Sequence, residues 1–114
     1  MFNEYDRIAL TEPISFEEAE HIPELSPLRK SGEGLLPGDV GTIIDIVDIK
    51  GKGKYYMVEF LVPDSFGYPV AITTVNPEKM RLATKNDVEN SRFCKYSESI
   101  IQAIPVLKEI TEEK

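Results

Sequence analysis

The stretch GEGLLPGDVGTIIDIV, Gly32 to Val47, decides the fold because residues typical of a tight turn are followed there by a long apolar run. Pro37 and Gly38 form the centre of an expected type II turn, in which proline presets one φ and glycine supplies the positive one. Asp39 can accept hydrogen bonds from nearby backbone N–H groups and fix that turn. The β-branched run that follows is typical of a strand. The stretch therefore predicts a tight turn that leads into a strand.

The predicted strand VGTIIDIVDI has apolar residues on both of its faces. By strict alternation, one face holds Val40, Ile44 and Ile46, and the other holds Ile43, Val47 and Ile49. Such a strand needs cover on both sides, or a bend that moves it from one environment to another. A helical tail is the expected cover for the second face.

Four further strand signals surround this one. They are YDRIAL (5–10), YYMVEFLV (55–62), VAITTV (70–75) and the short run from Met80 to Ala83. KGKGK (50–54) is expected to form a hairpin tip, and Asn76 with Pro77 a single 3₁₀ turn. Five short strands with tight links favour a mainly β protein with a small SH3-like barrel, in which glycines let the strands bend. The alternative is a five-stranded Greek-key barrel of the OB type, whose inter-strand helix is missing from its usual place.

Residues 1–84 form this expected barrel, and the connection Thr11 to Gly34 is long for a compact domain. Within it, Ser15 and Glu18 have the spacing of a capping box, which predicts a short helix in SFEEAEHIPEL. Pro23 and Pro27 limit that helix to one or two turns.

The spacing of apolar residues in 85–114 differs from that of the strands and predicts a C-terminal helical extension. Apolar residues recur there at spacings of three and four, namely Phe93, Tyr96, Ile100, Ile101, Ile104 and Leu107. Asn90 or Ser91 is the expected cap at its start, and Pro105 is expected to kink it. The stripe needs a surface to cover, either on its own barrel or on another chain.

The pieces EYDRIAL, GLLPGDVGTIIDI, YYMVEF and AITTVNPEKMRLA resemble a family of small bacterial SH3-like barrel proteins of unknown function. That family has the pattern YDxVxL…GLxxGDxGTV…YxVEF…xxTLxxxxLR. The resemblance runs from Asn3 to Thr84, less an insertion around residues 13–31, and the helical tail lies outside it. It implies a compact binding or accessory module, sometimes suspected of serving beside a toxin or nuclease, and it supplies no catalytic residues.

The net charge of −7 and the pI near 4.7 bear on the class of partner. Nucleic-acid affinity comes largely from cations that neutralise phosphates, so the charge argues against nucleic acid, and likewise against an anionic membrane surface. It favours a basic protein. The single cysteine, the absence of a long apolar run and the charged N-terminus predict a cytoplasmic protein.

No catalytic, cofactor or metal site is expected. Glu17 and His21 would share one side of a helix, but a metal site needs at least three converging ligands and His21 is the only histidine. Cys94 has cationic neighbours in the sequence but no histidine partner to activate it, so it is expected to be a packing residue.

The sequence leaves two functional hypotheses open. The first is a non-catalytic protein-interaction module, antitoxin-like or immunity-like, that binds a basic protein or forms a homodimer through its C-terminal helix. Its expected contact residues are Phe66, Tyr68, Phe93, Tyr96, Ile100 and Ile104. The second is a KOW-like nucleic-acid-binding module that uses the lysine hairpin, with Lys50, Lys52, Lys54 and Tyr55 as contacts.

Overall fold

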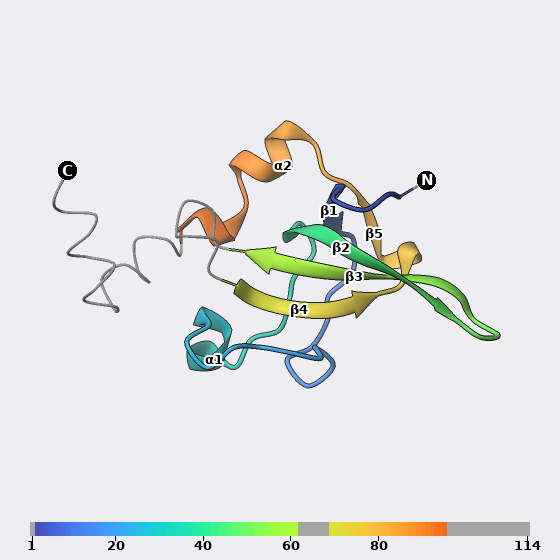
Figure 1. Cartoon of the computed structure of the whole chain (residues 1–114). Coiled ribbons are helices and arrows are strands. Elements are labelled where there is room, and N and C mark those ends of the chain that lie inside the picture. Colours follow the sequence, from blue (N-terminus) through green and yellow to red (C-terminus); the bar gives the residue numbers. More distant parts are fainter. Residues whose placement is uncertain (1, 62–68, 96–114) are drawn as a thin grey trace, which may run out of the picture.

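The computed structural model describes residues 2–61 and 69–95, which form one five-stranded antiparallel sheet (Figure 1). The strands are β1 (Arg7–Leu10), β2 (Val40–Ile49), β3 (Gly53–Leu61), β4 (Pro69–Val75) and β5 (Met80–Leu82), in the order β4-β3-β2-β1-β5. Two short helices, α1 (Pro27–Ser31) and α2 (Lys85–Glu89), and two 3₁₀ turns, η1 (Pro77–Lys79) and η2 (Arg92–Lys95), complete it. The predicted mainly β class and the five strands are confirmed. The sheet is open, because no pairing joins β4 to β5 among the described residues.

A β-bulge in β2 explains its two apolar faces. The register shifts between Ile43 and Asp45, so that Ile43 pairs with Val58 and Ile46 pairs with Tyr56. Val58 and Tyr56 are both buried and lie on one face of β3. Ile43 and Ile46 therefore share the core face, and the expectation of strict alternation is wrong beyond the bulge. The extra residue moves the second half of the strand from one environment to the other.

The long connection between β1 and β2 covers the core. Its buried apolar side chains are Ile14, Ile22 and Leu28, and Leu35 just after it is buried as well. Ile14 pairs with Leu35 through an isolated bridge, so the connection closes on itself. His21 pairs with Ile72 by two backbone hydrogen bonds, 3.0 and 2.9 Å, and this bridge occupies the outer edge of β4. The connection thus buries apolar surface and protects a sheet edge.

The predicted helix in this connection is in the wrong place. Ser15 and Glu18 exchange both hydrogen bonds of the expected capping box, each 3.2 Å, but they close only a turn. The helix is α1, which begins after Ser26. The Ser26 hydroxyl accepts from the Leu28 N–H and donates to the Val70 carbonyl. Pro27 starts the helix rather than stopping it, because the first helical position needs no N–H donor.

The turn before β2 has the predicted geometry. Gly38 has a φ of 92°, and the Asp39 N–H donates to the Leu36 carbonyl at 3.0 Å. The Asp39 carboxylate accepts from the Leu36 N–H at 2.7 Å, so it fixes the turn as expected. Gly41 serves a different purpose: a Cβ there would lie 2.5 Å from Cγ1 of Val58. It lets β2 approach the core side of β3.

The segment after β5 is partly as predicted. The Asn76 side chain caps η1, as expected. Thr84 and Asp87 form a capping box that starts α2, which was not expected, and Asn90 ends this helix instead of starting one. The Ser91 hydroxyl accepts from the Phe93 N–H at 3.3 Å and caps η2. The rest of the predicted tail helix lies outside the described residues.

In Figure 1 the connection and α1 lie below β4, while α2 lies above β2 and β3. The β2–β3 hairpin extends past the other strands, and its tip is the loop that joins β2 to β3. Within the described ranges, no helix has the length and apolar character needed to cross a membrane.

Candidate functional site

The segment from α2 to η2 is held against the sheet at both ends. At one end, Arg81 makes two hydrogen bonds to Asp87, 2.6 and 2.9 Å. The Arg81 guanidinium, followed by the Thr84 N–H, holds the pKa of Asp87 well below its ordinary value. At the other end, Arg92 binds Asp39, which is only 2% exposed. The segment is therefore fixed in position beside β1 and β2.

The Arg92 contact gathers several groups around one guanidinium. Nε donates to Oδ1 of Asp39 and Nη2 donates to Oδ2, both at 2.8 Å. Nη2 also donates to the Gly34 carbonyl at 2.9 Å, and Nη1 to Glu33 at 3.2 Å. A two-bond pairing of this kind is directional as well as strong. The pairing joins η2 to the turn of Pro37, Gly38 and Asp39 that precedes β2.

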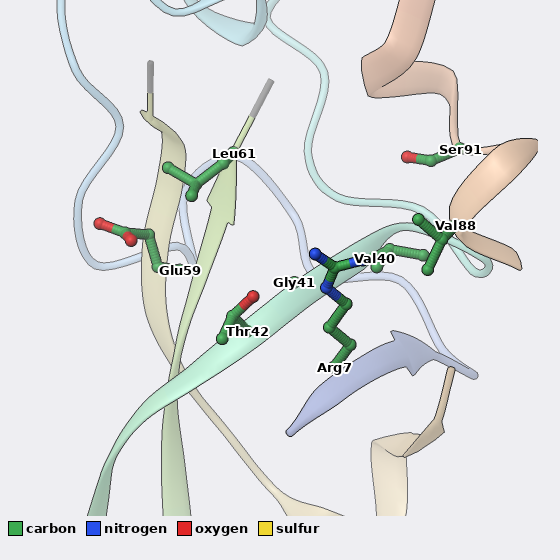
Figure 2. Close-up of a pocket in the computed structure, with 8 residues that line it drawn as sticks. All are labelled: Arg7, Val40, Gly41, Thr42, Glu59, Leu61, Val88 and Ser91. Carbon is green, nitrogen blue, oxygen red and sulfur yellow. The ribbon is translucent and has the colours of Figure 1, made fainter. Parts of the chain in front are cut away.

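A pocket of about 150 Å³ lies between this segment and the face of β1, β2 and β3 that points away from the core (Figure 2). It is lined by Arg7, Val40, Gly41, Thr42, Glu59, Leu61, Val88 and Ser91. The strand register places the polar residues: Arg7 pairs with Thr42, and Thr42 pairs with Glu59. They therefore form one row across three strands, on the face opposite Ile8.

The pocket has one cationic wall and several aliphatic ones. Figure 2 shows Arg7 reaching over β2 toward Val40, while the carboxylate of Glu59 points away from it. Val40, Leu61 and Val88 supply the aliphatic surface. Sites for drug-sized molecules usually have about 300–1,000 Å³. A pocket half that size or less suits one or two side chains of a peptide better than a cofactor.

The connection between β1 and β2 forms a second candidate surface, which is acidic. Its exposed carboxylates are Glu12, Glu17, Glu18, Glu20, Glu24 and Glu33. Glu17, Glu20, His21 and Phe16 line a hollow of about 280 Å³ there. The Arg29 guanidinium lies 5.4 Å from the centre of the Phe16 ring and fixes one wall.

Glu17 and His21 are two residues of this surface whose types suit a metal ion. Both residues line the hollow, and His21 is exposed. No group of three or more His, Cys, Asp or Glu side chains in residues 2–61 and 69–95 is arranged to hold a metal ion. Two carboxylates, Glu17 and Glu20, line the hollow beside the Arg29 guanidinium and the Phe16 ring.

The lysine hairpin forms a third candidate surface. Lys50, Lys52 and Lys54 are all exposed at the tip. The tyrosines beside them are engaged elsewhere: the Tyr55 hydroxyl accepts from Asn76 at 3.4 Å, and Tyr56 is 3% exposed in the core. The structure thus brings the three lysines together without a free aromatic ring from Tyr56.

Of the predicted protein-contact residues, only Phe93 is described. It is fully buried, and its ring packs edge-on against Phe60 with 6.2 Å between the ring centres. Phe93 is therefore a core residue of this chain and not part of an exposed contact surface. The other expected contacts, Phe66, Tyr68, Tyr96, Ile100 and Ile104, lie outside the described residues.

Sequence reasoning missed two features of the site. The capping box of Thr84 and Asp87 follows the ordinary pattern of a hydroxyl residue and an acid three positions later, and that pattern could have located α2. The pairing of Arg92 with Asp39 has no local signal, because the two residues are 53 positions apart. Comparisons of the chain with protein families, with curated proteins and with solved structures find no match, so the geometry described above carries the functional argument.

Proposed function

We propose that the protein is a cytoplasmic, non-catalytic interaction module that binds a basic protein partner, in the manner of an antitoxin or immunity protein. The observation that carries this proposal is the acidic connection, which has six exposed glutamates, two of which, Glu17 and Glu20, line a hollow with a half-buried aromatic wall. Opposite charge steers association and sets specificity at protein interfaces. The Phe16 ring beside the carboxylates is held in place by the Arg29 guanidinium, which lies 5.4 Å from its centre.

A binding role suits this surface better than catalysis. Its carboxylates are exposed to water, whereas catalytic electrostatics depend on a water-excluded site. The backbone beneath is well fixed: the Glu20 carboxylate accepts from the Thr74 N–H at 2.7 Å, and the Glu20 N–H donates to the Thr73 hydroxyl at 3.2 Å. A surface that is already ordered loses little conformational entropy on binding.

We also propose an SH3-like architecture for residues 1–84. The strand order β4-β3-β2-β1-β5, the bend in β2 at its bulge and the 3₁₀ turn η1 just before β5 support it. The long connection would then be the large loop between the first two strands, and it carries the acidic surface. This architecture places the proposed contact residues on a loop held by a rigid sheet, as is common for binding sites.

The test uses the full-length protein to recover a partner from extracts of its native cells. It compares wild type with a variant in which the charge of the connection is reversed. The variant Glu12→Lys, Glu17→Lys, Glu24→Lys changes carboxylates that make no described hydrogen bond or ion pair. The control Glu4→Lys, Asp48→Lys, Glu78→Lys makes the same charge change elsewhere on the surface. A basic protein recovered by wild type and control but at least tenfold less by the variant supports the proposal. Wild type that elutes alone, or equal recovery by all three proteins, contradicts it.

Nucleic-acid binding by the lysine hairpin is the second candidate. Three exposed lysines at a projecting tip favour it. Binding of RNA and DNA oligonucleotides at several salt concentrations tests it. This candidate predicts binding at low salt that Lys50→Glu, Lys52→Glu, Lys54→Glu abolishes. Absence of binding at low salt, or binding that these substitutions leave unchanged, excludes it.

A further inference from the structure

We infer that the pocket beneath α2 and η2 is a docking site for this chain's own C-terminal tail, residues 96–114. These residues lie outside the described part of the structure. The inference is independent of the basic partner proposed above, since it concerns the opposite side of the strands from the acidic connection.

The first support is the chemistry of the pocket. Val40 and Leu61 from the sheet and Val88 from α2 form its apolar walls, and about 150 Å³ accommodates one or two aliphatic side chains. All three walls are only partly buried by the described residues. Filling the pocket would remove apolar surface from water, which is favourable.

The second support is where the described chain ends. Ser91 lines the pocket, and Lys95 is the last described residue. Arg92 and Phe93 fix the backbone between them, through the pairing with Asp39 and the packing against Phe60. The tail therefore starts from a fixed point a few residues from the pocket. Even as a continuous helix it would span roughly 28 Å, which is more than enough to cross a pocket of this size.

The third support is the apolar stripe of the tail. Phe93 is the first residue of the predicted stripe, and it packs inside its own chain. If the helical spacing continues, the following apolar residues extend from this anchor toward the same chain. They are Ile100, Ile101, Ile104 and Leu107.

Tethering favours this occupant over a second copy of the protein, whose tail would carry the same charges. The tail has four glutamates against two lysines, and the pocket presents the exposed cation Arg7 together with Glu59, whose carboxylate points away from Arg7 (Figure 2). No ion pair occupies Arg7 within residues 2–61 and 69–95. A short tether gives an effective concentration in the millimolar range, above the concentration of a second chain in a dilute solution.

A paramagnetic label on the tail of the full-length protein tests the inference. The label is attached at Gln102→Cys in a Cys94→Ala background, at a position off the apolar stripe. We expect broadening of the NMR signals of Val40, Leu61 and Val88, and none at the distant hairpin residue Lys52. The broadening should persist on dilution and should be absent when labelled, isotopically unenriched protein is mixed with unlabelled, enriched protein.

A matched pair of tail substitutions separates docking from chance proximity. Ile104→Glu, on the stripe, should abolish the broadening, whereas Ser99→Glu, off the stripe and of equal charge, should preserve it. Broadening seen only in the mixed sample would place the tail on a second copy and overturn the inference. Absence of broadening in both samples, or equal effects of the two substitutions, would also overturn it.

Discussion

Arg92 and Asp39, 53 positions apart in the chain, pair through two hydrogen bonds of 2.8 Å. This contact joins the last described turn, η2, to the turn that precedes the longest strand. Asp39 also accepts from the Leu36 N–H. One buried carboxylate thus fixes both the entry into β2 and the position of the C-terminal segment.

Removal of Arg92 should destabilise the protein strongly. In Arg92→Leu the Asp39 carboxylate remains buried without its cation, and breaking such a pair costs about 3 kcal/mol. The control Arg7→Leu removes an exposed arginine with no described ion pair and should change the free energy of unfolding by less than about 0.5 kcal/mol. Urea unfolding of both variants measures the difference. Equal effects of the two substitutions would contradict a structural role for the pairing.

The pairing of Arg81 with Asp87 should make stability depend on pH in the acid range. The pKa of Asp87 is lowered in the folded protein, chiefly by Arg81, so the unfolded chain takes up this proton first as the pH falls. The stabilisation is therefore fully present above the unfolded pKa, near 3.8, and is lost as the pH falls toward the lower folded pKa. The Asp87→Asn variant should have a lower free energy of unfolding than wild type at neutral pH. The difference between the two proteins should become smaller in acid. A difference in free energy of unfolding that stays constant below about pH 4 would contradict this role of Asp87.

Gly41 should not tolerate a side chain. A Cβ at this position would lie 2.5 Å from Cγ1 of Val58 and 2.9 Å from Cδ1 of Phe60. Gly41→Ala therefore forces the two strands apart or moves core side chains, at a cost of about 1–3 kcal/mol. Thermal unfolding measures the loss. An unchanged melting temperature would show that β2 and β3 are not packed this closely.

Tyr5 should be a site of stored backbone strain. It has a φ of 69°, which is unfavourable for a residue with a side chain, and its ring is 75% exposed. The turn holds it there, because the Asn3 N–H donates to the Asp6 carboxylate and the Tyr5 N–H to the Ile43 carbonyl. Tyr5→Gly should raise the free energy of unfolding by about 0.5–1 kcal/mol, because the extra backbone entropy that glycine loses on folding offsets part of the relieved strain. Tyr5→Ala, which keeps the strain, should not. A loss of stability in Tyr5→Gly would mean that the ring contributes packing.

The strands were predictable because their signals are local. The turn of Pro37, Gly38 and Asp39 and the β-branched run after it depend only on neighbouring residues, and the structure reproduces them. The bulge was not predictable in position, because Ile43, Ile44 and Ile46 would suit either face of β2. The misplaced helix has a similar cause: a proline can end a helix or begin one, and only the cap at Ser26 decides between them.

The candidate sites were less predictable than the strands. The glutamates of the connection are visible in the sequence, but their surface depends on the bridge between His21 and Ile72. The pocket brings Arg7 and Val88 together from opposite ends of the described chain. Such non-local contacts follow from strand register and from the Arg92 pairing, and neither leaves a pattern in a single sequence.

Binding of a basic protein through the charge of the acidic connection can be measured directly. The most direct measurement is the Kd of the recovered partner at a series of salt concentrations, for wild type and for the variant Glu12→Lys, Glu17→Lys, Glu24→Lys. Salt screens exposed charges over about 8–10 Å at physiological ionic strength. We expect the wild-type affinity to fall steeply as salt increases, and the variant to bind at least tenfold more weakly at low salt with a flatter salt dependence. An affinity that is insensitive to both salt and charge reversal would contradict it.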